Sequence, residues 1–424
     1  MLENVKKLAS KPVFNLPNKP NIPELSLEDV APARAYIATY WKKLERFHPK
    51  DDDTLLGLPH PYLVPASEEG HDFDFNEMYY WDSYFMVQGM LQPEHKKFVV
   101  GILENLLYLQ KKYGAIPNAS RMYLTGRSQP PLLTTFIFDI YDAFKMDKKW
   151  LAGAIAVAEA EYENVWLGTR KPHNRKVYKD LSRYYDINML HDLAEAESGW
   201  DMTPRFGRRA LDYIPVDLNS LLYKYETDFV RAAKIAGNSS AVKKWKAAAE
   251  KRAKTIESLL WSNLRNFYYD YNYKKQKRGM VASLAGFYPL WAGLVSQQRA
   301  EKLVKTLRKF EQKGGLATTD VSPFSQKLPG ALPAQWAYPN GWAPLQYLVI
   351  KGLEQYGYHA DAKRIAIKWL KTNNDWFVKN GVFLEKYNVA QPTKPPLKGV
   401  YPSQVGFGWT NAIFERLCKD YLDV

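Results

Sequence analysis

The chain has 424 residues, 46% hydrophobic and 25% charged, which is typical of a globular protein with a sizeable core. Its net charge of +14 comes from Lys and Arg residues that are scattered along the chain without a groove-reading motif, which argues against a nucleic-acid-binding protein. Cys418 is the only cysteine, so an intrachain disulfide and a cysteine metal cluster are excluded.

Residues 1–25 are rich in Pro and Asn and predict an extended N-terminal arm. Residues 26–424 predict one domain, because neither a linker-like stretch nor a repeat of fixed period interrupts them. No run is apolar enough to span a membrane, and the first residues lack the apolar core of a secretory signal. We therefore expect a cytoplasmic protein with no membrane partner.

Helical patterns dominate from Ser26, which can cap a helix running to about Arg46. Periodicity predicts further helices at 81–91, 95–112, 131–145, 148–166, 216–236, 239–262, 283–293, 297–312, 341–356, 359–378 and 407–422. The clearest pattern follows Ser239 and Ser240, with apolar residues at intervals of three and four: Val242, Trp245, Ala249, Ala253, Ile256 and Leu260. Only 267–273 and 382–387 have the character of short strands.

Long connections separate several of these helices, at 51–80, 114–130, 167–215, 314–340 and 381–406. Connections of this length in a compact domain usually carry function. Periodicity alone predicts a large all-α domain. The twelve helices and the long loops favour an (α/α)6 toroid, in which six inner helices stand inside six outer ones, with short β-hairpins.

The long loops are rich in Trp, carboxylate, amide and Arg side chains. Cleavage of a glycosidic bond needs an acid for the leaving oxygen and a second carboxylate that attacks the anomeric carbon or activates water. Arg, Asn and Gln can bind sugar hydroxyls, and Trp can stack on the ring. Any single carboxylate could equally be solvated or cap a helix. Asp201 stands between Trp200 and a Thr203-Pro204 turn that would partly desolvate it, raise its pKa and suit it to donate a proton.

Six motifs in order resemble those of trehalases, and more broadly of related α-glycosidases with a toroidal fold. They are Tyr80-Trp81-Asp82-Ser83-Tyr84, Ile116-Pro117-Asn118 with Arg127-Ser128-Gln129-Pro130-Pro131, Glu197-Ser198-Gly199-Trp200-Asp201, Pro339-Asn340-Gly341-Trp342-Ala343-Pro344-Leu345-Gln346, Leu384-Glu385-Lys386-Tyr387 and Gly406-Phe407-Gly408-Trp409-Thr410-Asn411. The match runs from about Phe75 to Asn411.

The resemblance implies an inverting glycoside hydrolase that cleaves a small α-linked glucoside, with trehalose as the first expectation. It assigns the general acid to Asp201 and the general base to Glu385, with carboxyl groups about 6.5–9.5 Å apart so that one water fits. It places the sugar-binding side chains at Tyr80, Trp81, Asp82, Asn118, Arg127, Gln129, Trp200, Gln335, Trp336, Asn340, Trp342, Tyr387 and Trp409.

Four departures from the trehalase pattern concern recognition. Asp74 stands where trehalases have Arg, Ala337 where they have Asp, and Val400 where they have Glu. The Arg-Pro-Glu-Ser stretch expected after Tyr184 is missing. Lost acidic groups on a basic chain would suit a substrate that carries a carboxylate. A glucosylglycerate or mannosylglycerate hydrolase on the same fold is therefore the alternative, and a catalytically silent carbohydrate-binding protein is a further one.

Other kinds of site have no support in the sequence. The seven His residues include no His-Glu-x-x-His motif and no i, i+4 pair, so no catalytic metal is expected. Nucleotide-binding glycine motifs and Gly-x-Ser-x-Gly are missing, which argues against a nucleotide cofactor and a serine esterase. We expect no cofactor and a small sugar as the only partner, with the oligomeric state open.

Overall fold

The first helix of the computed structural model, α2 (Leu27–Leu44), begins as the sequence predicts. The Ser26 hydroxyl accepts a hydrogen bond from the Asp29 N–H, and the Asp29 carboxylate accepts one from the Ser26 N–H, which makes a reciprocal cap. The structure describes residues 22–67, 75–169, 175–325, 334–399 and 403–423. Most of the expected N-terminal arm lies outside this part of the chain.

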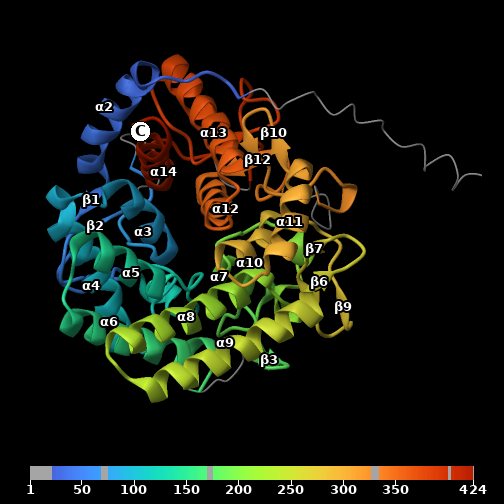
Figure 1. Ribbon diagram of the computed structural model, residues 1–424. Coiled ribbons are helices and arrows are strands. Elements are labelled where there is room, and N and C mark those ends of the chain that lie inside the picture. The colour runs from blue at the N-terminus through green and yellow to red at the C-terminus, as the bar shows by residue number, and fades with distance from the viewer. Residues whose placement is uncertain (1–21, 68–74, 170–174, 326–333, 400–402, 424) are drawn as a thin grey trace, which may run out of the picture.

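The helices form two concentric layers around a ring (Figure 1), which confirms the predicted (α/α)6 toroid. The inner layer contains α3 (Tyr80–Val87), α5 (Leu133–Phe144), α8 (Val216–Ile235), α10 (Tyr288–Trp291), α12 (Ala343–Gln355) and α14 (Gly408–Tyr421). The outer layer contains α2, α4 (Lys96–Tyr113), α6 (Lys148–Glu161), α9 (Ser239–Leu260), α11 (Gln297–Thr306) and α13 (His359–Asn380).

The two layers differ in how much of each helix is buried. Every residue of α3 is buried, whereas α9 buries one stripe that includes Trp245, Ala249 and Ile256. A helix that is apolar on one stripe faces water with the other, so α9 belongs outside. Its cap is not Ser239 or Ser240 but Asn238, whose side chain accepts the Ala241 N–H. Among the described residues, no helix combines the length and the apolar composition needed to cross a bilayer.

The connections between helices contain short antiparallel sheets of two or three strands. They are β1 (Glu45–Arg46) with β2 (Tyr62–Leu63), β3 (Lys176–Tyr178) with β4 (Leu181–Ser182), β5 (Tyr213–Ile214) with β8 (Tyr271–Asn272) and β9 (Lys277–Arg278), β6 (Trp261–Ser262) with β7 (Phe267–Tyr268), β10 (Glu311–Gln312) with β11 (Gly315–Leu316), and β12 (Asn340–Trp342) with β13 (Lys386–Asn388). The predicted strand 267–273 is therefore two strands, and the one predicted at 382–387 begins only at Lys386.

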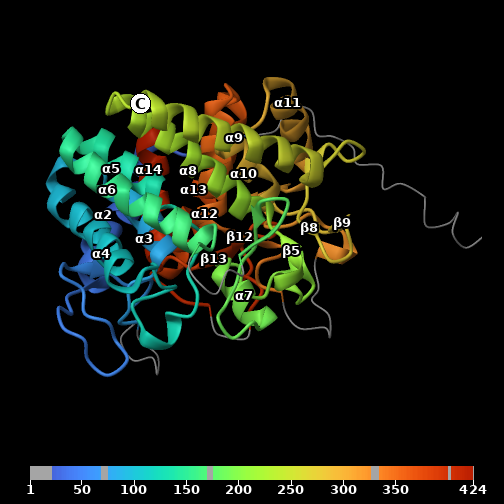
Figure 2. The same cartoon turned by 90° about the horizontal axis from the view of Figure 1, so that it is seen from below.

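Among the described residues, one α-helix was not predicted. The short α7 (His191–Glu197) lies in the connection 167–215, which the sequence indicated as a loop. Its buried residues include Glu195 and Glu197, so apolar spacing gives no helical signal. In the view from below, α7 and β5 lie on the side of the ring where long connections gather (Figure 2). The candidate residues of the third motif therefore come from this side.

A buried carboxylate ties four helices together inside the ring. Glu161 of α6 accepts hydrogen bonds from the hydroxyls of Tyr80 on α3 and Tyr225 on α8 at 3.1 and 2.7 Å, and from the Trp166 indole. Both tyrosine hydroxyls also accept the Leu133 N–H at the start of α5. Burial raises the pKa of Glu161 to about 7, although these donors favour its charged form.

The raised pKa of Glu161 predicts a pH-dependent contribution to stability. The carboxyl contributes most when protonated, below its unfolded pKa, and this contribution is lost as the pH rises through about 7. Glu161→Gln stays neutral throughout, so its unfolding free energy relative to that of wild type should increase by up to about 3 kcal/mol between about pH 5 and about pH 8. Its melting temperature relative to that of wild type should increase over the same range. Thermal unfolding of both proteins at several pH values measures this; a constant difference contradicts it.

Candidate active site

Three carboxyl groups from separate motifs meet inside the ring. Asp82 lies in the first turn of α3, Asp201 in the turn that follows α7, and Glu385 immediately before β13. The charges of Glu385 and Asp201 both raise the pKa of Asp82, and the charge of Asp201 raises that of Glu385. Such mutual effects require proximity. Residues 201 and 385, far apart in sequence, therefore lie close to each other and to Asp82, and the three form one carboxyl cluster.

Both the side chain and the backbone of Glu385 have hydrogen-bond partners. Its side chain is buried, and burial raises its pKa, while the Lys386 ammonium, 2.5 Å from Oε2, acts in the opposite direction. The Glu385 N–H donates to the Gln404 carbonyl, and its own carbonyl accepts the Trp409 indole N–H at 3.1 Å. The last two motifs thus fix the backbone on both sides of the carboxyl.

Lys386 contacts Glu385 directly, and sequence reasoning assigned it no role. It is fully buried, and its Nζ lies 4.9 Å from the centroid of the Trp342 ring across the β12–β13 pair. Successive side chains on a strand normally point to opposite faces, so an ion pair between Glu385 and its neighbour could not be read from the motif.

Asp201 is half-buried, as expected from its neighbours Trp200 and Thr203. The Gln335 amide lies 3.4 Å from Oδ2 and 3.5 Å from the Asp201 carbonyl. Gly199 has φ +71°, and a Cβ there would lie 2.6 Å from the Trp81 ring. The glycine of this motif therefore allows both the left-handed turn and the close approach of Trp81.

Five tryptophans form one buried aromatic cluster around the carboxyl groups. Trp336 stacks on Trp342 with centroids 3.7 Å apart and on Trp200 at 5.3 Å. Trp81 and Trp409 complete the cluster through tilted and edge contacts. Much of each ring is covered by another ring. The Trp336 indole N–H, however, has no hydrogen-bond partner among the described residues and is available to a ligand hydroxyl.

The second motif contacts the first turn of α3, which carries Trp81 and Asp82. The Gln129 side chain accepts the Trp81 N–H at 2.9 Å and also hydrogen-bonds to Asp82. Asn118 donates to the Ser128 carbonyl, which fixes the loop. The Arg127 guanidinium pairs with Asp186 at 3.1 Å, and its buried Nε has no partner in the described part of the chain. Arg127 therefore keeps a donor for a ligand.

Three predicted sugar-binding residues use their polar groups within the protein. Tyr80 bonds to Glu161, and the Tyr387 hydroxyl accepts the Leu384 N–H at 2.9 Å. The Asn340 amide donates to the carbonyls of Gln335 and Leu397 at 3.0 Å. Direct sugar contact by these side chains stays a prediction. Their hydrogen bonds in the structure join neighbouring segments of the protein.

Of the departures from the trehalase pattern, Asp74 and Val400 lie outside the described residues. Ala337 is fully buried and packs in a small apolar cluster with Ala334 and Met202, next to Asp201. The lost acidic side chain is thus replaced by apolar contact. Where the Arg-Pro-Glu-Ser stretch is missing, the loop after Asp186 exposes Ile187, Met189 and Leu190.

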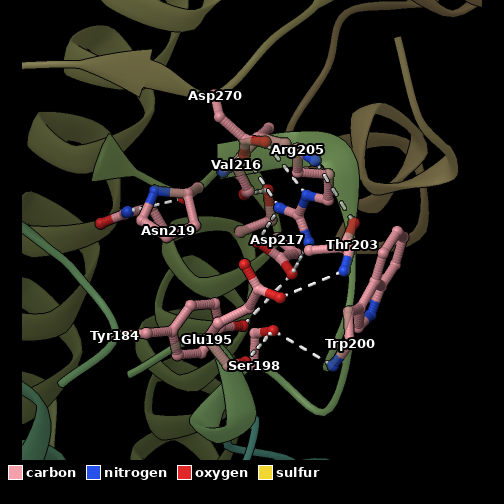
Figure 3. Close-up of polar contacts among 12 residues, drawn as sticks. Tyr184, Glu195, Ser198, Trp200, Thr203, Arg205, Val216, Asp217, Asn219 and Asp270 are labelled. Atoms are coloured by element: carbon pink, nitrogen blue, oxygen red, sulfur yellow. Dashed lines mark hydrogen bonds and ion pairs between the residues drawn. The ribbon is translucent and has the colours of Figure 1, made fainter. Parts of the chain in front are cut away.

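Glu195 of α7 lies behind Asp201 and was also missed. Its Oε1 accepts the Thr203 N–H at 3.1 Å (Figure 3), and burial raises its pKa to about 8, with a further contribution from the charge of Asp201. No sequence signal distinguishes Glu195 from an ordinary helical glutamate. Within the described residues, no three side chains of the metal-binding types are grouped so that they could hold an ion.

The fold and the site define an (α/α)6-toroid protein in which neighbouring carboxyl groups lie beside a cluster of tryptophans. A family model described as Trehalase matches residues 18–192 and 186–421. The chain belongs to the trehalase family.

Two relatives illustrate the match. The cytosolic neutral trehalase of Kluyveromyces lactis is 32% identical over 86% of this chain and 56% of its own length. The periplasmic trehalase of Xanthomonas axonopodis pv. citri is 31% identical over 96% of this chain and 76% of its own length. The chain thus spans little more than half of the Kluyveromyces protein.

Solved structures agree with the fold. Neutral trehalase Nth1 from Saccharomyces cerevisiae superimposes with a TM-score of 0.75 at 31% identity, covering 88% of this chain and 76% of that one. The GH63 mannosylglycerate hydrolase from Thermus thermophilus gives a TM-score of 0.68 at 19% identity, covering 90% of this chain and 99% of that one. The second likeness concerns the fold alone.

The close approach at Gly199 predicts an effect on the site. Gly199→Ala should displace Trp81 or the Asp201 turn, so any catalytic efficiency that depends on Asp201 should fall about tenfold to a hundredfold. Gly237→Ala is the matched control, because Gly237 has φ +72° but open space around it, and it shares only the backbone strain. Equal activity of the two variants, at matched folded fractions from thermal unfolding, contradicts this role of Gly199.

Proposed function

We propose that the protein is an inverting glycoside hydrolase that cleaves trehalose into glucose. The observation that carries the proposal is the proximity of Asp82, Asp201 and Glu385 to one another beside the tryptophan cluster. Membership of the trehalase family and two trehalase relatives at 31–32% identity support the choice of substrate.

In the proposed reaction, Asp201 donates its proton to the glycosidic oxygen as the bond to the anomeric carbon breaks. Glu385 accepts a proton from a water molecule whose oxygen attacks that carbon from the opposite face. Burial raises the pKa of Glu385, which makes it a stronger base, and the Lys386 ammonium favours the charged form that a base needs. Asp82, with a pKa of about 8, is neutral at neutral pH and can donate to a sugar hydroxyl.

The second candidate is hydrolysis of glucosylglycerate or mannosylglycerate, favoured by the acidic groups missing from the trehalase pattern. Trehalose stays ahead because apolar packing fills the position of Ala337 and supplies no cation for a carboxylate. A silent sugar-binding protein is disfavoured, because both expected catalytic carboxylates are present and buried partners hold them.

The compartment and the domain organisation belong to the same proposal. We propose that residues 26–424 act as a single catalytic domain, supported by the ring that the described helices close (Figure 1). Action in the cytoplasm rests on the sequence alone, since the relatives include cytosolic and periplasmic trehalases.

Incubation of the purified protein with trehalose, glucosylglycerate and mannosylglycerate, with an assay for released hexose, tests the substrate. Trehalose should be turned over most efficiently. Turnover of either glycerate without release from trehalose would reverse the order of the two candidates. Sugar binding without turnover of any of the three would favour the silent binding protein.

Removal of either reacting carboxyl should abolish turnover while binding remains. Asp201→Asn and Glu385→Gln should each lower kcat by about two to four orders of magnitude, with KM changed far less. Asp139→Asn is the matched control, because Asp139 is a partly buried carboxyl on α5 that hydrogen-bonds to Gln88 and is not part of the carboxyl cluster. A loss of kcat in Asp139→Asn equal to that in the other two would remove the special role of the pair.

Lys386 predicts a specific pH effect. Because its ammonium lowers the pKa of Glu385, Lys386→Met should raise that pKa and move the acidic limb of the kcat profile about one unit or more towards higher pH. The base must be ionised to act, so activity at low pH is lost first. A pH–rate profile with an unmoved acidic limb would show that Glu385 is not the base or that Lys386 does not govern it.

A further inference from the structure

A buried arginine lies a few residues after Asp201, in the short 3-10 turn Pro204–Phe206. The Arg205 guanidinium is fully buried and binds two carboxylates at once (Figure 3). It donates to both oxygens of Asp217 at 2.8 and 2.7 Å and to both oxygens of Asp270 at 3.0 and 2.9 Å. Such forked pairs fix the plane of the guanidinium as well as its position.

The two carboxylates are themselves anchored to the ring. Asp217 lies in the first turn of α8 and accepts the Tyr184 hydroxyl at 3.2 Å. Asp270 lies between β7 and β8 and accepts the Val216 N–H at 2.9 Å. Arg205 is therefore bound to the inner wall of the toroid through two separate elements.

Contacts from this anchor reach both sides of Asp201. The Arg205 guanidinium lies 4.5 Å from the centroid of the Trp200 ring, the residue before Asp201. After Asp201, the Thr203 hydroxyl accepts the Arg205 N–H, and the Thr203 N–H donates to Glu195 (Figure 3). The turn is thus fixed at both ends.

We propose that Arg205, held by Asp217 and Asp270, is a positioning residue that sets where the Asp201 carboxyl stands relative to the glycosidic oxygen. This rests on the proposed function, in which Asp201 is the proton donor. An arginine buried with two carboxylates is not the most stabilising way to fill a core, because apolar residues of similar volume often do as well. The free-energy cost of burying these charges is offset if the arrangement fixes the geometry of Asp201.

The role has a chemical signature that stability alone lacks. A sugar alkoxide leaves only with a proton, whereas fluoride leaves with little acid assistance. A displaced proton donor therefore slows hydrolysis of trehalose far more than hydrolysis of α-glucosyl fluoride. A variant that merely unfolds in part loses both activities in equal proportion.

The test compares both substrates in wild type, Arg205→Lys and Asp270→Asn, with Asp201→Asn as the reference for a lost acid. Arg205→Lys keeps the charge and removes the fork, and Asp270→Asn keeps the shape and removes one charge. For both, kcat/KM on trehalose should fall about tenfold to a hundredfold, while the rate on α-glucosyl fluoride stays within about threefold of wild type. If Arg205→Lys does not fold, Asp270→Asn decides.

Glu226→Gln is the matched control, because Glu226 forms a buried pair with Arg252 at 2.8 Å between α8 and α9. It should leave the ratio of the two activities unchanged. Equal losses on both substrates, or no loss on trehalose, in Asp270→Asn overturn the positioning role while wild type remains active. A wild type that hydrolyses neither substrate overturns the proposed function, and the positioning role with it.

Discussion

Asp82, Asp201 and Glu385 lie close enough for their charges to repel one another, and the way in which this repulsion is relieved governs the rest of the site. Burial raises the pKa of Asp82 to about 8, so this group is neutral at neutral pH. Burial raises the pKa of Glu385, and the buried ammonium of Lys386, which also lies over the Trp342 ring, acts against this increase. Asp201 keeps part of its surface exposed. The three neighbouring carboxyl groups thus stand in three different environments, and differing environments are what give paired carboxyl groups separate acid and base roles.

The toroidal fold brings these three carboxyl groups together from segments that are distant in the sequence. Asp82 sits at the start of an inner helix whose every residue is buried, so its position is fixed by packing. Glu385 is fixed by the β12–β13 pair and by the Trp409 indole from the last motif. The Asp201 turn is the exception, since it belongs to a connection. It is tied to the inner wall through Arg205, Asp217 and Asp270, so that a loop acquires the rigidity of the ring.

Much of the fold could be predicted from the sequence, because apolar spacing records which helix face is buried. The Ser26 cap and the buried stripe of α9 are examples. The helix α7 was not predicted, because buried glutamates interrupt its apolar spacing. Motif resemblance predicted the pair Asp201 and Glu385. It could not predict the contact of Lys386 with Glu385 or that of Glu195 with Thr203, nor that Tyr80, Tyr387 and Asn340 form hydrogen bonds within the protein.

In the proposed reaction, Asp201 and Glu385 act together in a single displacement by water. In α,α-linked trehalose, attack by water with inversion releases one β-glucose and one α-glucose for each bond broken. Proton NMR of the earliest products, recorded before mutarotation, measures this ratio directly. Equal amounts of the two anomers are predicted. Initial release of α-glucose alone would mean retention of configuration and would contradict the assignment of Glu385 as a base that activates water.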